Sequence, residues 1–487
     1  MKTTRLVFAS LMAMAFVACE KAPVVDEVKS DECKLTSFTI SLGSTTLNGF
    51  VNQADKTVEI SYMPNELEQL TSATAVAVIS DKATITPDPA SPIDYTVEGG
   101  VRFTVTAEDE TTKSEYLIYL ASAEFSIQTE KVWSKTYGEL GLDPTASNMC
   151  GIAFTGRNHF ACSNKNVYDL SGNKVGTLNI DGITGMDVHS GQLGAMSNDN
   201  NGVLVALTLF NGQLVDGNTG IITETYAWKD GWDKKPTLIY RMEAECNYMS
   251  VSGDIESDFI LTFRTGAGNP QMHHVLSFKD GIFFNADGSS AAVWAGPFIQ
   301  HPGNDGNWGQ LLSFFTGNVE DGFVCWDSVS AAEMGDSGNS SSAVYLYNEG
   351  LSAFMAGNAT EVALKGNVTW TEWESEGRWY NYGNFSTGHV RAFVYNGQKY
   401  VVVCSASWPN TWITIQKATD LIEDDEDTED IDESRQNYLL TTDIVAGAAS
   451  CYPCSAYVYD PVSGTGHIVY LAQSSVAVAY DIKTTRL

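Results

Sequence analysis

Residues 394–397 read Val-Tyr-Asn-Gly and lie between two strand-like runs. Asn-Gly suits a tight hairpin turn because Asn tolerates a left-handed backbone. The same order, an aromatic or apolar residue followed by Asn or Asp and then Gly, recurs at residues 167–172, 209–212, 277–281, 346–350 and 458–464. Hairpins of this kind at irregular spacings predict a β-propeller with unequal blades.

The predicted propeller occupies residues 123–487, a region too long for one ordinary sandwich. Two successive sandwiches or a jelly roll with insertions are the alternatives. Helical periodicity is scarce, and Val, Thr, Tyr and Phe runs broken by Gly, Asn and Asp predict an all-β chain. A densely acidic insertion near residues 420–435 is predicted to be a solvated loop. A calcium role is the alternative, although the spaced Asp pattern of a calcium loop is missing.

Residues 35–122 form a second predicted module. Strand-like runs stand at residues 37–41, 57–61, 75–79, 95–97, 102–107 and 116–120, and several of them alternate apolar with polar residues. Alternation of this kind is typical of a half-buried strand in a sandwich. The length and the strand spacing predict an immunoglobulin-like β-sandwich.

The N-terminus reads as a secretory signal. Lys2 and Arg5 precede an apolar stretch that is too short to span a bilayer, and the stretch ends at Ala18-Cys19. The pattern resembles a bacterial lipobox, in which residues 1–18 are removed and Cys19 is acylated. Residues 19–34 would then form a flexible spacer. The alternative is an ordinary secreted protein with an accidental Cys.

A family resemblance rests on the order of segments in residues 35–122. An SFTI opening is followed by KTVEISYMP, by AVAVISDKATITPDPASPIDYTV and by a closing VRFTVTAEDETTKSEYLIYL. This order resembles the immunoglobulin-like modules at the N-terminus of Bacteroidetes surface lipoproteins, many of them encoded beside starch-utilisation-type glycan uptake systems. The resemblance implies a lipid-anchored protein on the outer membrane that faces the cell exterior. It also implies an outer-membrane glycan transporter complex as a partner to test.

Charge and cysteine content narrow the function further. The formal net charge of -32 would repel phosphate backbones, so no nucleic-acid partner is expected. Without Cys19, eight cysteines are left, an even number that permits disulfides in an exported protein. Cys451 and Cys454 have CxxC spacing and are interpreted as a local disulfide or two buried thiols. A redox or zinc role would need a context that the sequence lacks.

Four segments concentrate aromatic, amide and acidic side chains: 226–233, 294–308, 370–382 and 408–412. An aromatic plane stacks on the apolar face of a sugar while polar groups bond its hydroxyls. Each Trp has a competing interpretation, that it fills the packing between blades. The predicted ligand-binding residues are, first, Trp373, Arg378, Trp379 and Tyr382, and second, Trp294 and Trp308.

The sequence nominates no catalytic residue, metal or cofactor. No Gly-x-Ser-x-Gly, His-Glu-x-x-His or phosphate loop occurs. His273 and His274 would point to opposite faces of a strand and so would not share a ligand. The sequence therefore predicts a non-catalytic surface lipoprotein that captures poly- or oligosaccharide. A propeller hydrolase or lyase acting on polysaccharide, or a protein-binding adhesin, are the alternatives.

Overall fold

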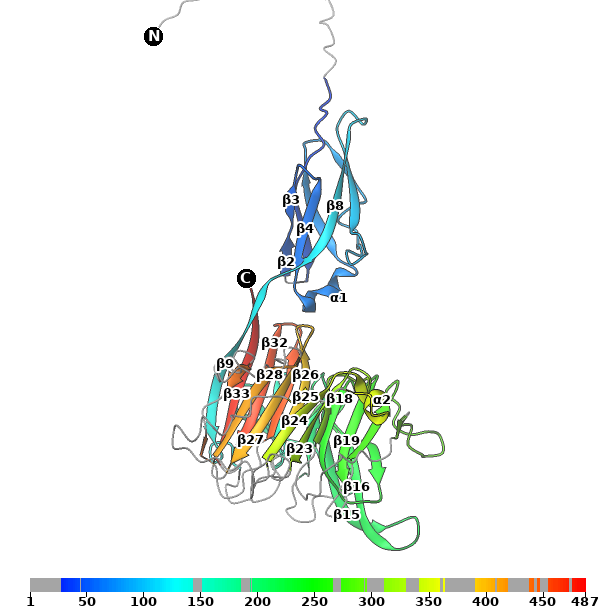
Figure 1. Ribbon diagram of the computed structural model, residues 1–487, viewed down its shortest axis with the longest axis vertical. Coiled ribbons are helices and arrows are strands. Elements are labelled where there is room, and N and C mark those ends of the chain that lie inside the picture. Colours follow the sequence, from blue (N-terminus) through cyan, green and yellow to red (C-terminus); the bar gives the residue numbers. More distant parts are fainter. Residues whose placement is uncertain are drawn as a thin grey trace, which may run out of the picture. The chain divides into compact units, whose positions relative to one another are not determined.

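The computed structural model describes residues 28–43, 45–142, 151–184, 193, 195–265, 273–292, 294–295, 311–329, 341–359, 362–363, 390–407, 410–418, 438–441, 445–446, 454–472 and 475–487. These residues are almost entirely β, as predicted (Figure 1). The helices within them are one turn of 3-10 helix at Pro64–Glu66 and the short α1 (Leu67–Leu70) and α2 (Gly350–Met355). The chain divides into two compact units, one up to Ser122 without Met63–Asn65, and one from Ala123 to Leu487 that includes Met63–Asn65.

The first unit has two sheets that enclose one core. One sheet has the order β2-β1-β5, with bounds Thr45–Asn48, Leu35–Leu42 and Thr74–Ile79. The other has the order β3-β4-β8-β7-β6, with bounds Phe50–Asn52, Thr57–Tyr62, Lys113–Ser122, Val101–Thr106 and Thr84–Thr86. Strands β4 and β8 are parallel. In β4, Val58 and Ile60 alternate with less buried residues and meet Phe38 of β1 in the core, so the unit is a β-sandwich.

One predicted strand of this unit is wrong. Residues 95–97 form no strand, although Tyr95 is fully buried. The backbone N–H of Tyr95 instead donates to Leu70 O at 2.9 Å, and the neighbouring residue in the pattern, Ile93, makes only an isolated bridge to Ala73. The sequence pattern at residues 95–97 therefore reflects the burial of one aromatic side chain between Pro- and Gly-rich turns, and not a strand.

The second unit contains six sheets whose strands follow one another in chain order. The first is β10 to β13 (Ile152–Phe154, His159–Cys162, Asn166–Asp169, Lys174–Thr177), and the second is β14 to β17 (Met196–Asn198, Leu204–Gln213, Thr219–Ala227, Thr237–Met242). The third is β18 to β21 (Cys246–Gly253, Phe259–Thr265, His273–Phe278, Trp294–Ala295), and the fourth is β22 to β25 (Leu311–Phe314, Phe323–Val329, Ser341–Tyr347, Val362–Ala363). The fifth is β26 to β29 (Val390–Tyr395, Gln398–Ser407, Asn410–Lys417, Tyr438–Thr441), with β30 (Val445–Ala446) paired to β28. The sixth is β31 to β33 (Cys454–Asp460, Thr465–Ala472, Val476–Arg486) together with β9 (Phe125–Thr136).

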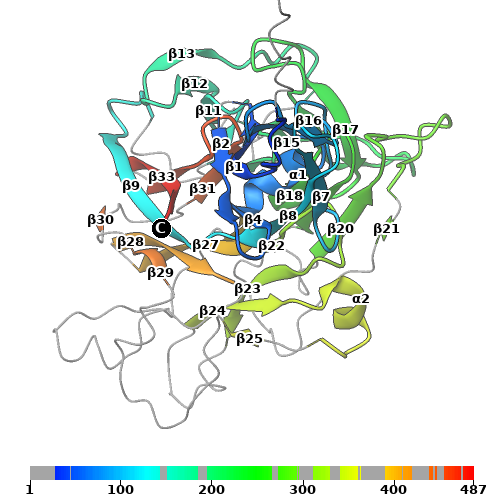
Figure 2. The ribbon, with the colours of Figure 1, turned by 90° about the horizontal axis from the view of Figure 1, so that it is seen from above.

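The six sheets lie around a common centre (Figure 2), and each packs both of its faces on its neighbours. In the third sheet, for example, Phe263 packs toward the second sheet, whereas Ile260 packs toward the fourth. The sixth sheet packs on the first through Val458 and Phe154. Because both faces are covered, burial in the inner strands is continuous rather than alternating, as in β20, where every residue is buried.

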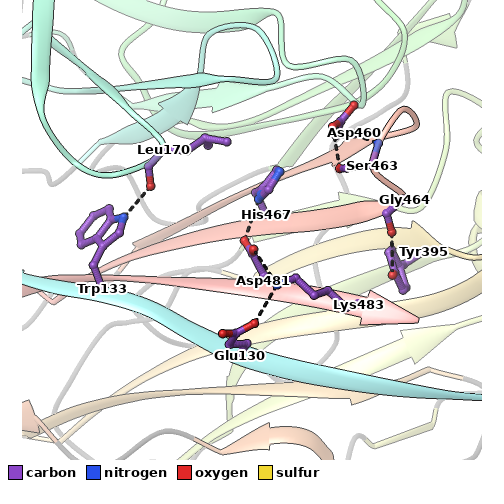
Figure 3. A network of polar contacts seen from close by, with 10 residues as sticks. All are labelled: Glu130, Trp133, Leu170, Tyr395, Asp460, Ser463, Gly464, His467, Asp481 and Lys483. Carbon is purple, nitrogen blue, oxygen red and sulfur yellow. Dashed lines mark hydrogen bonds and ion pairs between the residues drawn. The ribbon is translucent and has the colours of Figure 1, made fainter. Parts of the chain in front are cut away.

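The last sheet takes its outer strand from the start of the unit. Strand β9 pairs with β33 along its length, from Phe125–Arg486 to Thr136–Val476. Across this junction Lys483 Nζ contacts Glu130 Oε2 at 2.7 Å (Figure 3). On the other side of β33, Asp481 Oδ1 lies 2.7 Å from Nδ1 of His467 on β32. The two ends of the unit are thus held in one sheet.

Three of the predicted hairpin turns lie where the sequence placed them. Asn396 and Gly397 both have positive φ, 49° and 71°, and join β26 to β27 with Tyr395 opposite Gln398. Residues 458–464 join β31 to β32, and residues 167–172 join β12 to β13.

Two other predicted turns are wrong. Asn211 and Gly212 lie inside β15, paired with β16, and the chain reverses later at Gly217, where φ is 85°. The Asp216-Gly217 pair is an equally good turn signal, and the later turn allows more strand pairing. Residues 346–350 lead into α2 instead of a hairpin, and Gly350, with a positive φ of 83°, is the first residue of that helix.

Candidate functional site

The sheets of the second unit share two ends. Within each sheet the first strand runs into a turn toward the second strand, and these turns meet one another. The contacts that join turns of neighbouring sheets include Gly156 N to Gly202 O at 2.6 Å, Asn200 N to Gly253 O at 2.8 Å, Lys399 Nζ to Asp321 O at 2.5 Å and Tyr395 Oη to Gly464 O at 3.0 Å. We call the end of the unit where these turns lie the turn end. The first strands begin at the opposite end, which we call the loop end.

For the predicted ligand-binding residues, the structure describes only the neighbouring strands, and these strands connect them to the loop end. Trp294 lies in β21, the fourth strand of the third sheet. Trp308 lies outside the described residues, just before β22, and Trp373, Arg378, Trp379 and Tyr382 lie outside them before β26. Both β22 and β26 are first strands. Cys19 and the acidic insertion also fall outside the described residues.

One of the four aromatic segments is internal packing. Trp228 is 2% exposed, lies in the core between the first and second sheets, and donates from Nε1 to Asn179 O at 2.8 Å. Trp232 packs against the same core, and its ring covers Gly176 so closely that a Cβ there would lie 2.4 Å from the ring. For segment 226–233 the packing interpretation is therefore correct.

Polar side chains fill the centre of the ring. Arg391 of β26 is 3% exposed and donates to Ser197 Oγ at 2.9 Å and to Asn198 O at 2.5 Å. Asn198 in turn donates from Nδ2 to Tyr457 O at 2.8 Å and accepts from Phe154 N at 3.1 Å. These bonds connect the second sheet with the fifth, sixth and first sheets. The Arg391 guanidinium therefore serves as a structural tie across the centre.

Asp199 lies beside this tie in the turn after β14. It is fully buried, and burial raises its pKa to about 6 even though backbone N–H groups of Asn201, Val203 and Ile255 donate to it. Burial also lowers the pKa of Arg391 to about 10, so the guanidinium keeps its charge at neutral pH.

A second buried arginine differs from Arg391. Arg264 is the penultimate residue of β19, at the loop end, and it is 6% exposed. Its guanidinium carbon lies 4.5 Å from the centre of the Tyr248 ring. Within the described part of the chain, its Nε and Nη1 have no hydrogen-bond partner. His273 is directly opposite Arg264 on β20, and so its side chain shares that face of the sheet.

Sequence reasoning missed this cluster. The sequence feature that could have indicated it is a single Arg in the otherwise apolar or neutral strand FILTFRT at residues 259–265. The adjacent His273 and His274 both lie on β20, where successive side chains point to opposite faces. His274 is opposite Phe263, and burial lowers the pKa of His274 to about 4, which keeps that ring neutral.

The described residues contain no candidate metal site, and their two thiols with raised pKa values are protonated. They contain no group of three or more His, Cys, Asp or Glu side chains that could hold a metal ion. Burial raises the pKa of Cys246 to about 11 and that of Cys404 to about 12, so both are thiols at neutral pH. Cys454 is buried in the core between the sixth and first sheets, and Cys451 lies outside the described residues. Among the described helices, none has the length and apolar character that crossing a membrane requires.

Comparison with known proteins gives one family match. Residues 35–119 match the family described as "SGBP, N-terminal", the N-terminal domain of surface glycan-binding proteins of Bacteroidetes. The match covers the first unit and leaves the second unit unassigned. No protein with curated annotation matches the chain.

Two of the solved structures that match this chain are distantly similar to it. A DUF4623 family protein from Bacteroides eggerthii matches over 93% of this chain and 99% of its own, with 13% identity and a TM-score of 0.44. Fructan 1-exohydrolase IIa from Cichorium intybus matches over 69% of this chain and 57% of its own, with 10% identity and a TM-score of 0.29. At these scores the similarities carry no argument about function.

Proposed function

We propose that this chain is a non-catalytic, lipid-anchored protein of the bacterial surface that captures poly- or oligosaccharide for uptake. The observation that carries the proposal is the match of residues 35–119 to the N-terminal domain of surface glycan-binding proteins. The first unit is then an immunoglobulin-like spacer of residues 35–122, and the ligand site belongs to the second unit.

The second unit is proposed to be a six-bladed β-propeller formed by residues 123–487. Three observations support this assignment: the sequential order of the sheets, the packing of each sheet between two neighbours, and the completion of the sixth sheet by β9. Radial repetition of this kind leaves only short, protected sheet edges, which suits a protein exposed outside the cell.

The N-terminal part is proposed to be a signal of residues 1–18, a lipidated Cys19 and a spacer of residues 19–34. A lipid anchor of this kind would hold the protein on the outer membrane facing the cell exterior. An outer-membrane glycan transporter complex is the proposed partner, because captured glycan must be passed to an importer.

The glycan is proposed to bind at the loop end. Trp373, Arg378, Trp379 and Tyr382 are the first candidates, with Trp294 and Trp308 second. Their support is topological: the segments that carry them lead into first strands, and these strands begin at that end. Because the tryptophans of segment 226–233 pack in the core, the other aromatic segments are the candidates that are left.

The test is an array of polysaccharides followed by calorimetry on the glycan that binds. Sugar stacking at or below the scale of base stacking, about 1–3 kcal/mol per ring, predicts that Trp373→Ala or Trp379→Ala weakens binding by about tenfold or more. Phe50→Ala is the matched control, because it removes an aromatic ring that is 73% exposed in the first unit. All variants should keep the native circular dichroism spectrum.

A reducing-end assay on the same glycans separates capture from catalysis. Cleavage by the wild-type protein would replace the proposal with the hydrolase or lyase alternative. Unaltered affinity in both Trp variants would place the site elsewhere. Failure to bind any glycan, together with binding to a host or bacterial protein, would favour the adhesin.

A further inference from the structure

We infer that Arg264, with Tyr248 and His273, forms an anion-binding site at the loop end that takes the carboxylate or sulfate ester of an acidic glycan. That the ligand is a glycan rests on the proposed function. That the ligand is negatively charged rests on the geometry around Arg264. It names the substrate class, which the family match does not.

The first observation is that Arg264 is a buried cation whose donors are incompletely used. At 6% exposure, most of its side chain has left water, and Nε and Nη1 have no acceptor in the described structure. Buried arginine normally has its N–H groups paired, because desolvated donors without acceptors are costly. A charged acceptor is the partner that best offsets this cost.

Arg391 shows what a purely structural arginine looks like in the same fold. It is buried to a similar degree, yet both of its terminal nitrogens donate, to Ser197 and Asn198, and only its Nε lacks an acceptor. Nε and Nη1 of Arg264 make no hydrogen bond of this kind within the described residues, and the Tyr248 ring lies against the face of the guanidinium. Stacking on the face leaves the donors, which lie in the guanidinium plane, available to an oxyanion.

The backbone around the site is shaped to hold this arrangement. Tyr248 has a left-handed φ of 54° and lies at a register shift between Asn247 and Met249, where β18 bulges against β19. A bulge re-aims a side chain out of the regular alternation. The bulge thereby brings the Tyr248 ring over the guanidinium of Arg264.

The position of the cluster fits a ligand that enters from the loop end. Arg264 is next to last in a strand that runs from the turn end, and its neighbour His273 begins β20 on the same face. The protein's net charge of -32 opposes acidic ligands at long range, but screening at physiological salt limits that repulsion to about 8 Å. Short-range contact with Arg264 then decides binding.

The first test measures thermal unfolding of the full mature protein in sodium acetate, sodium sulfate and sodium chloride at equal ionic strength. Sulfate stabilises proteins without a site, so Arg264→Met, the charge-removal control Arg102→Met and the wild type are compared. Arg102 is exposed in an ion pair with Glu115 of the first unit. We expect acetate or sulfate to raise the melting temperature of the wild type and Arg102→Met more than that of Arg264→Met. Equal anion effects in all three would overturn the inference.

The stability of the variants without added anion is the second measurement. Arg264→Met should melt at or above the wild type, because it removes a buried charge with unused donors. Arg391→Met should melt lower, because it removes two bonds across the ring. A large loss of stability in Arg264→Met would show that the guanidinium is already paired within the chain and would refute the anion site.

The third test uses an array of matched polysaccharides: polygalacturonate with its methyl ester, and dextran sulfate with dextran, beside other acidic and neutral glycans. Acidic glycans should bind the wild type more tightly than their neutral counterparts. Arg264→Met should lower that affinity by about 10- to 100-fold, as expected for hydrogen bonds to a charged group. Binding only of neutral glycans, unchanged in Arg264→Met, would overturn the inference and leave the proposed function intact. Anion effects on melting without binding of any acidic glycan would overturn the glycan assignment.

Discussion

Trp133 offers a direct test of how the second unit is closed. It lies on β9, and its side chain reaches from the sixth sheet to the first. The ring stacks on Phe160 with centroids 5.9 Å apart. Its Nε1 donates to Leu170 O at 2.6 Å (Figure 3). Trp133→Ala removes all of these contacts at once. The variant therefore weakens the junction between the sheet that β9 completes and the sheet that follows it in the chain.

The expected loss follows from the contacts. A fully buried Trp→Ala change costs about 3–5 kcal/mol, and because Trp133 is only partly buried we expect about half of that from packing. The hydrogen bond adds about 1 kcal/mol. We expect Trp133→Ala to lower the free energy of unfolding by about 2–4 kcal/mol, and Trp133→Phe, which keeps a stacked ring, by about 1–2 kcal/mol.

The assay is urea denaturation followed by far-ultraviolet circular dichroism, with hydrogen exchange read by mass spectrometry. Exchange should accelerate in β9 and β33 more than in β18 or β19. Val132→Ala is the matched control, since Val132 precedes Trp133 on the same strand and is 47% exposed. If Trp133→Ala unfolds like Val132→Ala, or exchange rises evenly over the unit, closure through β9 is not what holds the ring together.

Further predictions concern the anchor, the division of the chain and pH. Cys19→Ala should move the protein from the membrane fraction to the soluble fraction, and unchanged fractionation would refute lipidation. A chain beginning at Glu124 should fold and bind glycan without the first unit, whereas insolubility or lost binding would show that the first unit contributes to the site. Asp199 has a folded-state pKa of about 6 against an ordinary value of 3.8, so its favourable contribution is present below pH 4 and is lost as the pH rises through 6. That loss is about 3 kcal/mol in full, and it should appear as a smaller pH dependence of unfolding between pH 4 and 7 in Asp199→Asn than in the wild type.

Local sequence determined the secondary structure well. Strand-forming runs in β4 and β7 alternate because one face of each is buried, and Asn396-Gly397 turns because both residues accept a left-handed backbone. Where two turn signals compete, as at Asn211-Gly212 and Asp216-Gly217, local chemistry is equal and the extent of strand pairing decides. The N-terminal module was recognisable because its strand order is contained in one short segment, which the family match to residues 35–119 supports.

The candidate sites were less predictable because their character depends on what surrounds them. Trp228 and the loop tryptophans have the same local signal, and only the packing of two sheets shows Trp228 to be internal. The proposed ligand residues around Trp373 remain a prediction from the sequence.

Tertiary structure alone decided the closure and the buried charges. Strand β9 pairs with β33 from the opposite end of the unit, and such pairing between distant segments has no local code in the sequence. Arg264 and Arg391 are both single arginines in a strand sequence. Arg391 donates hydrogen bonds across the centre, whereas Arg264 stacks on Tyr248 and has Nε and Nη1 without an acceptor. The pKa of Asp199 likewise depends on burial beside the ring centre, because desolvation and hydrogen bonding are properties of the folded surroundings and not of the residue itself.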